Sequence, residues 1–198
     1  MDAPRRFGPQ NLTYGSDDPE SREKLRELIL FVSERCQNDG SFGVTKLNKV
    51  LFYADFFSFA KYGESITGIS YNKLPYGPVP TAATTVRSQM EAEDEAFLTK
   101  QGYSPYQTHR LIPRREANLD LFKARDIALV DGVIEALADL SGRRVSELSH
   151  GRAWESVADF ERIPYEAAFV DDTPLTEVDV AAAHEMLDEF EHFDSTRD

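Results

Sequence analysis

The chain of 198 residues carries 35 acidic and 22 basic side chains, a formal charge of -13, and a single cysteine. This length suits one domain that buries roughly 70% of its unfolded surface, and one cysteine excludes an intrachain disulfide and fits a reducing compartment. No run approaches the ~18 consecutive apolar residues of a membrane helix, and the first residues lack the apolar core of a signal peptide. We therefore expect a soluble, cytoplasmic protein whose acidic surface repels nucleic-acid phosphates and favours a basic protein partner.

The first segments are an arm and an amphipathic helix. Residues 1–17 mix Pro, Gly, Asn and Ser without periodicity, which predicts a flexible or extended arm. Asp18 can cap a helix whose first position is Pro19, and the helical pattern continues until residues 38–40. Cys36 falls on the apolar stripe of this helix, so we expect a small buried side chain rather than a reactive thiol.

The segment around which the chain is organised is a helix predicted over residues 46–62. Thr45 is its expected N-cap, and Gly63 suits the left-handed position after its end. Apolar residues surround this helix on nearly all sides, which is typical of the buried centre of a domain. Asp55 lies two turns from Asn48 on the same strip, so its carboxylate needs hydrogen bonds or a counter-charge.

A short strand at residues 69–72 precedes a proline-rich loop at residues 74–80. The prolines restrict the residues before them and Gly77 tolerates unusual dihedral angles, so the loop is rigid and presents Tyr76. Two interpretations stay open. The loop either only joins a strand to a helix or is a pre-ordered recognition loop.

The remaining pattern alternates helices with one hairpin. We expect Trp154, the only tryptophan, to line the core or a groove, and the hairpin to join the strand at 69–72 in one small antiparallel sheet. From Glu166 onward the chain has eleven acidic residues and, apart from histidines, a single basic residue. The predicted elements are a helix from Pro80 or Thr81 to Met90, a hairpin of 97–99 and 106–112, a helix over 119–140 closed by Gly142, a short helix over 145–154 capped by Ser146 that restarts near Gly151, and a final helix from Thr176.

Together these segments predict a mainly α (α+β) fold. A single helical domain over residues 18–170 surrounds the buried central helix and includes a small antiparallel sheet or hairpin. The flexible arm of residues 1–17 precedes it, and an acidic C-terminal helix of residues 171–198 packs on it.

The sequence contains no recognised set of catalytic or metal-binding residues. The four histidines lack the spacing of a zinc site, and there is no glycine-rich phosphate loop and no nucleophile elbow. We therefore expect no cofactor, no metal and no enzymatic activity. The alternative is a hydrolase built from His150, Asp55 and a serine.

Direct binding to DNA is a second alternative that the sequence leaves open. A helical core with a small sheet is compatible with a winged-helix reader. There is no long basic stripe, however, and short arginine pairs more often bridge nearby acids. The arginines that could form a basic patch are Arg110, Arg114, Arg115, Arg143 and Arg144.

Three pieces of the chain together resemble a known family. KLNKVLFYADFFSFAKYGESITG, YNKLPYGPVP and LSHGRAWE, in this order and spacing, resemble the Panacea antitoxin domain, also called the SocA-like or GepA phage-associated family. The resemblance extends over residues 44–154, and IPYEAAF at residues 163–169 continues it.

The resemblance implies a non-enzymatic antitoxin of a type II toxin–antitoxin system. Such a protein binds and silences a toxin protein, usually encoded by the adjacent gene, and related domains pair with toxins of unrelated folds. A protease that receives the toxin, or a second copy of the chain, is an alternative partner. The alternative function is a DNA-binding transcriptional regulator or a phage-associated protein of prophage origin, although we do not expect direct binding to nucleic acid.

The matching motifs supply the predicted site residues. Because an acidic antitoxin can occupy a basic toxin site as a phosphate mimic, we expect direct masking with Tyr76 as an anchor. The predicted partner-binding residues are Tyr76, Pro78, Val79, His150 and Trp154, and the predicted structural residues are Lys46, Tyr53, Asp55, Tyr62, Gly63 and Gly77.

Overall fold

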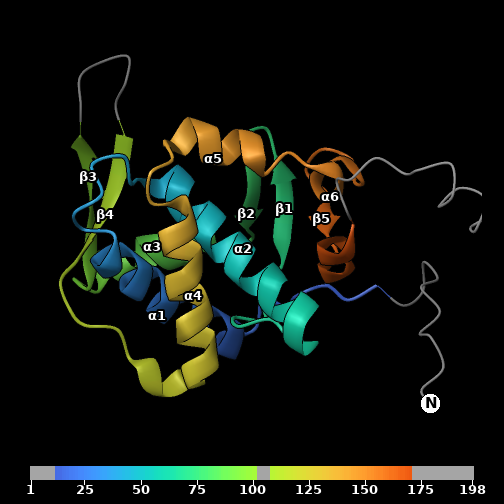
Figure 1. Ribbon diagram of the computed structural model, residues 1–198. Helices are drawn as coiled ribbons and strands as arrows, with labels where there is room; N and C mark the ends of the chain where they lie inside the picture. Colours follow the sequence, from blue (N-terminus) through green and yellow to red (C-terminus); the bar gives the residue numbers. More distant parts are fainter. Residues whose placement is uncertain (1–11, 102–107, 171–198) are drawn as a thin grey trace, which may run out of the picture.

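The computed structural model describes residues 12–101 and 108–170, and the predicted final helix and acidic segment lie outside them (Figure 1). Helices with two small antiparallel sheets confirm the predicted α+β fold. Within the described residues, no helix is both long and apolar enough to span a membrane. The elements in chain order are α1 (Pro19–Arg35), α2 (Val44–Tyr62), β1 (Tyr71–Leu74), β2 (Gly77–Pro80), α3 (Ala83–Ala92), β3 (Ala96–Gln101), β4 (Thr108–Pro113), η1 (Leu119–Leu121), α4 (Ala124–Leu137), α5 (Gly142–Leu148), α6 (Arg152–Glu155), β5 (Arg162–Ile163) and η2 (Tyr165–Phe169).

Helix α2 is the buried centre of the molecule, as its apolar surface predicts. It packs against α1, α4, α5, β2 and η2, and Figure 1 shows α4 crossing it. Its end at Gly63, with φ +76°, confirms the predicted left-handed cap. Its start differs from the prediction, because Gly43 rather than Thr45 is the N-cap residue. A Cβ at Gly43 would lie 2.1 Å from the Thr108 side chain, so β4 leaves no room for a capping side chain there.

Helix α1 confirms the predicted cap and ends slightly early. The Asp18 carboxylate accepts a hydrogen bond from the Ser21 amide at 2.8 Å, and Pro19 occupies the first turn. The helix ends at Arg35, because the Arg110 guanidinium donates to the carbonyl oxygen of Cys36 at 2.6 Å and holds the end of the helix. Cys36 is 5% exposed, which confirms the small buried side chain.

The proline-rich loop is half of a β-hairpin. Strands β1 and β2 pair antiparallel with Tyr71 opposite Pro80 and Leu74 opposite Gly77, so the turn is only Pro75–Tyr76. The predicted strand at 69–72 therefore lies two residues further on. Prolines are tolerated in β2 because it is the edge strand of the sheet, which has the order β2-β1-β5.

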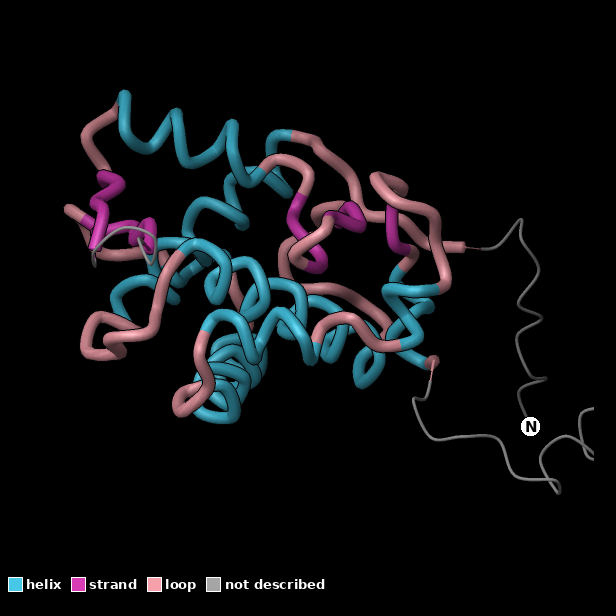
Figure 2. The backbone as a smooth tube through the Cα atoms, turned by 90° about the horizontal axis from the view of Figure 1, so that it is seen from above, coloured by secondary structure: helices cyan, strands magenta, loops and turns pink. Residues whose placement is uncertain are grey.

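The expected single sheet is wrong. The predicted hairpin forms as β3 and β4, but it makes a sheet of its own. In Figure 2 the strands form two separate groups with helices between them. β3 and β4 pack with α1, α2 and α3, so the hairpin is held by helices rather than by β1.

Several helix boundaries differ from the predicted ones because local N-caps begin helices at other residues. The predicted helix over 119–140 divides into η1 and α4, where the Lys123 amide donates to the Asp126 carboxylate at 3.0 Å. Gly142 opens α5 instead of closing α4, and Ser141 rather than Ser146 caps it. Helix α3 begins later than predicted because Pro80 belongs to β2. The restart after Gly151 is confirmed by α6.

Residues 12–17, assigned to a flexible arm, are held against the domain. The Ser16 amide donates to the Gly68 carbonyl at 2.7 Å, and the Thr13 amide donates to the Glu166 carboxylate at 2.8 Å. The Tyr165 amide donates in turn to the Thr13 carbonyl at 2.8 Å. This end of the arm therefore runs beside residues 68–70, just before β1, and beside η2.

Candidate partner-binding site

The turn between β1 and β2 presents Tyr76 to solvent. Its side chain is 77% exposed, more than that of any other large hydrophobic residue in the part of the chain that the structure describes. Helix α5 holds the turn in place, because the Ser146 hydroxyl donates a hydrogen bond to the Tyr76 carbonyl at 2.8 Å. Gly77 completes the turn with φ +91°, a conformation that L side chains rarely adopt. Tyr76 is therefore an exposed aromatic side chain on a rigid support.

Gly77 also lets the hairpin approach α2 and α5 closely. A Cβ at this position would lie 2.2 Å from the Ser149 hydroxyl oxygen and 2.7 Å from Lys49 Cε. The Lys49 ammonium donates to the Pro78 carbonyl at 2.9 Å. Through these contacts the hairpin packs closely against α2 and α5 at Gly77.

Lys49 is the most unusual charged group near the turn. Its side chain is 1% exposed, and it forms no ion pair with a described carboxylate. Burial lowers the pKa of Lys49 to about 7. Sequence reasoning did not single out this residue, although a lysine in the middle of an otherwise apolar helix is a usable signal.

The rings of His150 and Trp154 stack beside the hairpin, 4.3 Å apart between centroids. The Lys73 ammonium lies 4.0 Å from the Trp154 ring centroid and donates to the Val157 carbonyl. Burial, followed by the charges of Lys49 and Lys73, lowers the pKa of His150, so its imidazole is neutral at pH 7. Nε2 of His150 and Nε1 of Trp154 are buried without a hydrogen-bond partner in the described structure.

A groove of about 1010 Å³ opens beside the turn, and we name it the Tyr76 groove. Its walls come from the start of α2, the β1–β2 turn, α3, β4 and α5, the last of which crosses the top of Figure 1. The side chains that set the charge and polarity of the groove are those of Tyr76, Arg87, His109, Arg143, Glu147 and His150.

The structure brings the five predicted partner-binding residues into one region but gives them different positions. Tyr76 and His150 line the Tyr76 groove, and Trp154 stacks on His150. Pro78 is buried in β2 and Val79 is half-buried, and neither lines the groove. Sequence reasoning missed Arg87, because only the fold places α3 beside the turn.

Lys46, predicted to be a structural residue, is buried at the start of α2. Its side chain is 2% exposed, and its ammonium donates to the Asp39 carboxylate at 2.6 Å. It also donates to the carbonyl oxygens of Ala138 at 2.9 Å and Leu140 at 2.8 Å. Lys46 therefore ties the start of α2 to the end of α4.

Asp55 has the hydrogen bonds that its burial requires. Its carboxylate is fully buried and accepts hydrogen bonds from the amide and hydroxyl of Thr67, at 2.7 and 2.5 Å, and from the Tyr71 hydroxyl at 2.7 Å. Burial raises the pKa values of both Asp55 and Tyr71. His150 is not among its partners, so the acid–histidine pair of the hydrolase alternative is not formed.

The other predicted structural residues lie along the second half of α2. Tyr53 is half-buried and its ring stacks on that of Phe57, with centroids 5.5 Å apart. The Arg125 guanidinium carbon lies 4.3 Å from the Tyr62 ring centroid, which links the end of α2 to α4. Gly63 ends the helix as described above.

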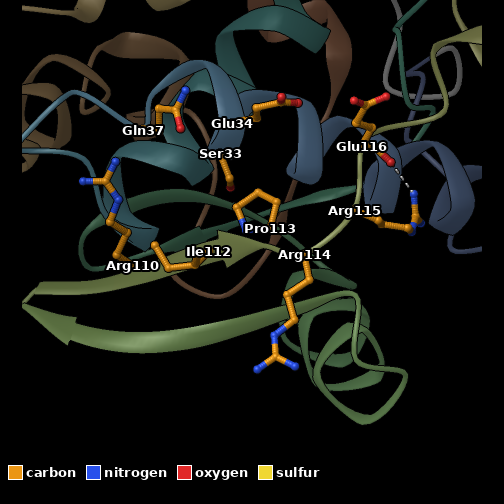
Figure 3. A pocket seen from close by; sticks show the side chains of 9 residues that line it. All are labelled: Ser33, Glu34, Gln37, Arg110, Ile112, Pro113, Arg114, Arg115 and Glu116. Atoms are coloured by element: carbon orange, nitrogen blue, oxygen red, sulfur yellow. Dashed lines mark hydrogen bonds between the residues drawn. The ribbon is translucent and has the colours of Figure 1, made fainter.

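All five arginines of the expected basic patch have partners within the chain, and four of them pair with acids, as the tendency of arginines to bridge nearby acids predicts. Three of them line a pocket of about 430 Å³ between α1 and β4, where Figure 3 shows Arg114 turned away from the other side chains. The partners are backbone carbonyls for Arg110, Asp94 for Arg114, Glu27 and Glu95 for Arg115, and Glu147 for both Arg143 and Arg144.

A comparison with protein families identifies the domain that contains this site. The family described as antitoxin SocA-like, Panacea domain, matches residues 47–155, more than half of the chain. The match runs from α2 to α6, so it includes the β1–β2 turn and the His150–Trp154 stack. No curated protein and no solved structure matches the chain. The chain belongs to the family of SocA-like antitoxins with a Panacea domain.

Proposed function

We propose that this protein is the non-enzymatic antitoxin of a type II toxin–antitoxin system in the cytoplasm. It neutralises a toxin protein, encoded by the adjacent gene, by direct contact through Tyr76 and the Tyr76 groove. The observation that carries this proposal is the 77% exposure of Tyr76 on a fixed turn within the family domain.

A rigid exposed tyrosine has the physical properties of a binding anchor. Tyrosine supplies a large contact area and is enriched among the residues that dominate interface energies. The backbone of the turn is already ordered by the Ser146 hydrogen bond and by Gly77, so little entropy is lost on binding. We expect truncation of an anchor of this kind to cost about 2–4 kcal/mol of binding free energy.

The charge of the chain supports a basic partner. Its formal charge of -13 speeds the approach of a cationic protein and slows that of nucleic acid. A toxin that acts on RNA, DNA or nucleotides needs a basic site for phosphate, and an acidic protein can occupy such a site as a phosphate mimic. Masking of the toxin therefore combines electrostatic attraction with burial of Tyr76.

The test is co-expression of the chain with each neighbouring open reading frame, scored by growth. One neighbour is expected to stop growth alone and to be silenced by the chain. Tyr76→Ala should abolish rescue with an unchanged melting temperature. Phe57→Ala is the matched control, because Phe57 is also exposed, at 50%, but lies roughly 20 Å further along α2 from the groove.

The outcomes separate the alternatives. A folded Tyr76→Ala variant that still protects fully would refute the anchor role. If the toxin disappears from rescued cells and returns when proteases are removed, the chain delivers the toxin to a protease. If no neighbour is toxic, the antitoxin function is contradicted and a DNA-binding regulator becomes the leading alternative.

A further inference from the structure

The Tyr76 groove contains a cation without a carboxylate partner. Arg87 on α3 lines the groove and is half-buried. It forms no ion pair with any carboxylate among residues 12–101 and 108–170, and its guanidinium makes one long hydrogen bond of 3.4 Å to the Asn48 amide oxygen. Burial lowers the pKa of Arg87, and the charge of Glu91, which forms no ion pair with it, opposes this shift only in part, so the arginine remains charged at pH 7. A partly desolvated guanidinium favours an anionic partner.

The rest of the groove lining is also short of negative charge. Glu147 is its only carboxylate among the described residues, and both Arg143 and Arg144 already pair with it. Lys46 is neutralised by Asp39, and the imidazoles of His109 and His150 complete the polar lining. The N-terminal end of α2 lines the same space, and its first turn contains no acid that would offset the positive end of the helix dipole. The groove is therefore locally positive on a protein whose formal charge is -13.

We propose that the Tyr76 groove receives an acidic segment of the partner protein, with Arg87 pairing to an aspartate or glutamate carboxylate. This inference rests on the proposed function and names the chemistry of the partner surface. The partner then presents two features, a basic site for the acidic surface of this chain and an acidic segment next to it.

Size and charge favour a peptide segment over other anions. The volume of about 1010 Å³ is at the upper end of the range of ~300–1,000 Å³ for ligand pockets, so it holds several side chains rather than a single ion. A nucleic acid would bring many phosphates to a chain of charge -13, whereas the groove offers one guanidinium without a carboxylate partner. An arginine matches one carboxylate with two parallel hydrogen bonds.

The test measures binding of a fluorescein-labelled eight-residue peptide of alternating Glu and Gly to the full chain by fluorescence anisotropy. The same peptide with Gln in place of Glu measures the contribution of charge. We expect the Glu peptide to bind at least tenfold more tightly than the Gln peptide. Arg87→Gln should weaken the Glu peptide tenfold or more, whereas Arg125→Gln, which changes an arginine beside Tyr62 at the far end of α2, should weaken it less than twofold.

Equal binding of the two peptides, or full binding by Arg87→Gln, would overturn the proposal. If Arg87→Gln does not fold, Arg87→Lys keeps the charge but loses the paired hydrogen bonds, and it should weaken the Glu peptide about threefold to tenfold without affecting the Gln peptide. A folded Arg87→Lys variant with unchanged affinity would also count against the pairing.

A further variant distinguishes the partner from the chain's own acidic segment. Residues 171–198 hold ten carboxylates, and a full-length variant replaces them with amides. Unchanged peptide affinity supports the partner as the occupant, whereas a tenfold gain would assign the groove to this segment and overturn the proposal. The peptide assay contains no toxin, so a negative peptide result does not contradict neutralisation in the growth test. A negative growth test likewise does not contradict binding of the Glu peptide to the groove.

Discussion

Lys49→Met should remove a pH dependence of stability that the buried ammonium creates. The unfolded chain holds a proton on this lysine up to a pKa of 10.5, whereas the folded chain holds it only up to about 7. Between these values the unfolded state binds more protons, so the unfolding free energy rises with pH. Below about pH 7 both states are protonated, and the cost of the buried charge is constant.

The size of the effect follows from the difference between the two pKa values. A shift of one pKa unit corresponds to about 1.4 kcal/mol, so the full cost at pH 7 is on the order of 5 kcal/mol. Between pH 7 and pH 9.5 the stability of the parent relative to Lys49→Met should rise by about 3 kcal/mol. The comparison with the variant is needed because burial also raises the pKa of Cys36 to about 11, which lowers stability in both proteins above pH 9.

The assay is urea unfolding followed by the fluorescence of Trp154, from pH 6.5 to pH 9.5. At pH 7 the Met variant should be at least as stable as the parent, because Met fills a similar volume without a charge. If the stability difference between parent and variant changes by less than about 0.5 kcal/mol over this range, Lys49 titrates as an exposed lysine and the prediction is wrong.

Two further substitutions test the supports of the fold by urea unfolding. Gly77→Ala should lower the unfolding free energy by about 2–4 kcal/mol, because its φ of +91° and the nearby Ser149 hydroxyl both oppose a Cβ. The control is Gly40→Ala, whose Cβ meets nothing within 4 Å and which should change stability by less than about 1 kcal/mol. Arg115→Met should lower the unfolding free energy by about 2–4 kcal/mol, because it removes the counter-charge of Glu27, whose side chain is only 5% exposed. The control is Arg143→Met, which removes an exposed ion pair worth less than about 1 kcal/mol. A loss no larger than that of its control would contradict either prediction.

Local signals in the sequence predicted the parts of the fold that neighbouring residues determine. The Asp18–Pro19 start of α1 and the left-handed end of α2 at Gly63 depend on residues within one turn. The all-round apolar pattern of α2 likewise predicted its burial. Asp55 was expected to need partners, but the sequence could not name Thr67 and Tyr71, because their side chains reach it only in the folded chain.

Contacts between distant segments determined what the sequence did not predict. Thr108 on β4 occupies the space next to Gly43, which moved the start of α2. The proline-rich segment was expected to be a loop, yet two prolines fit an edge strand once β1 lies on its other side.

The candidate site was predicted only in part. The sequence predicted a rigid loop that presents Tyr76, and Tyr76 is exposed in the structure. The structure also places His150 in the same groove. Lys49 and Arg87 were not singled out, because their significance comes from the absence of an ion pair to either cation in the described structure. Such an absence becomes visible only when the helices are packed.

Calorimetric titration of the chain with the purified toxin measures whether the two bind through Tyr76. The toxin is the neighbouring gene product whose toxicity the chain suppresses. We expect a stable complex with the parent and with Phe57→Ala, and an affinity about 30-fold to 1,000-fold weaker for folded Tyr76→Ala, which corresponds to the 2–4 kcal/mol of an anchor. Equal affinity for parent and Tyr76→Ala would show that Tyr76 is not the anchor, and no binding by the parent would show that the chain does not neutralise this toxin by direct contact.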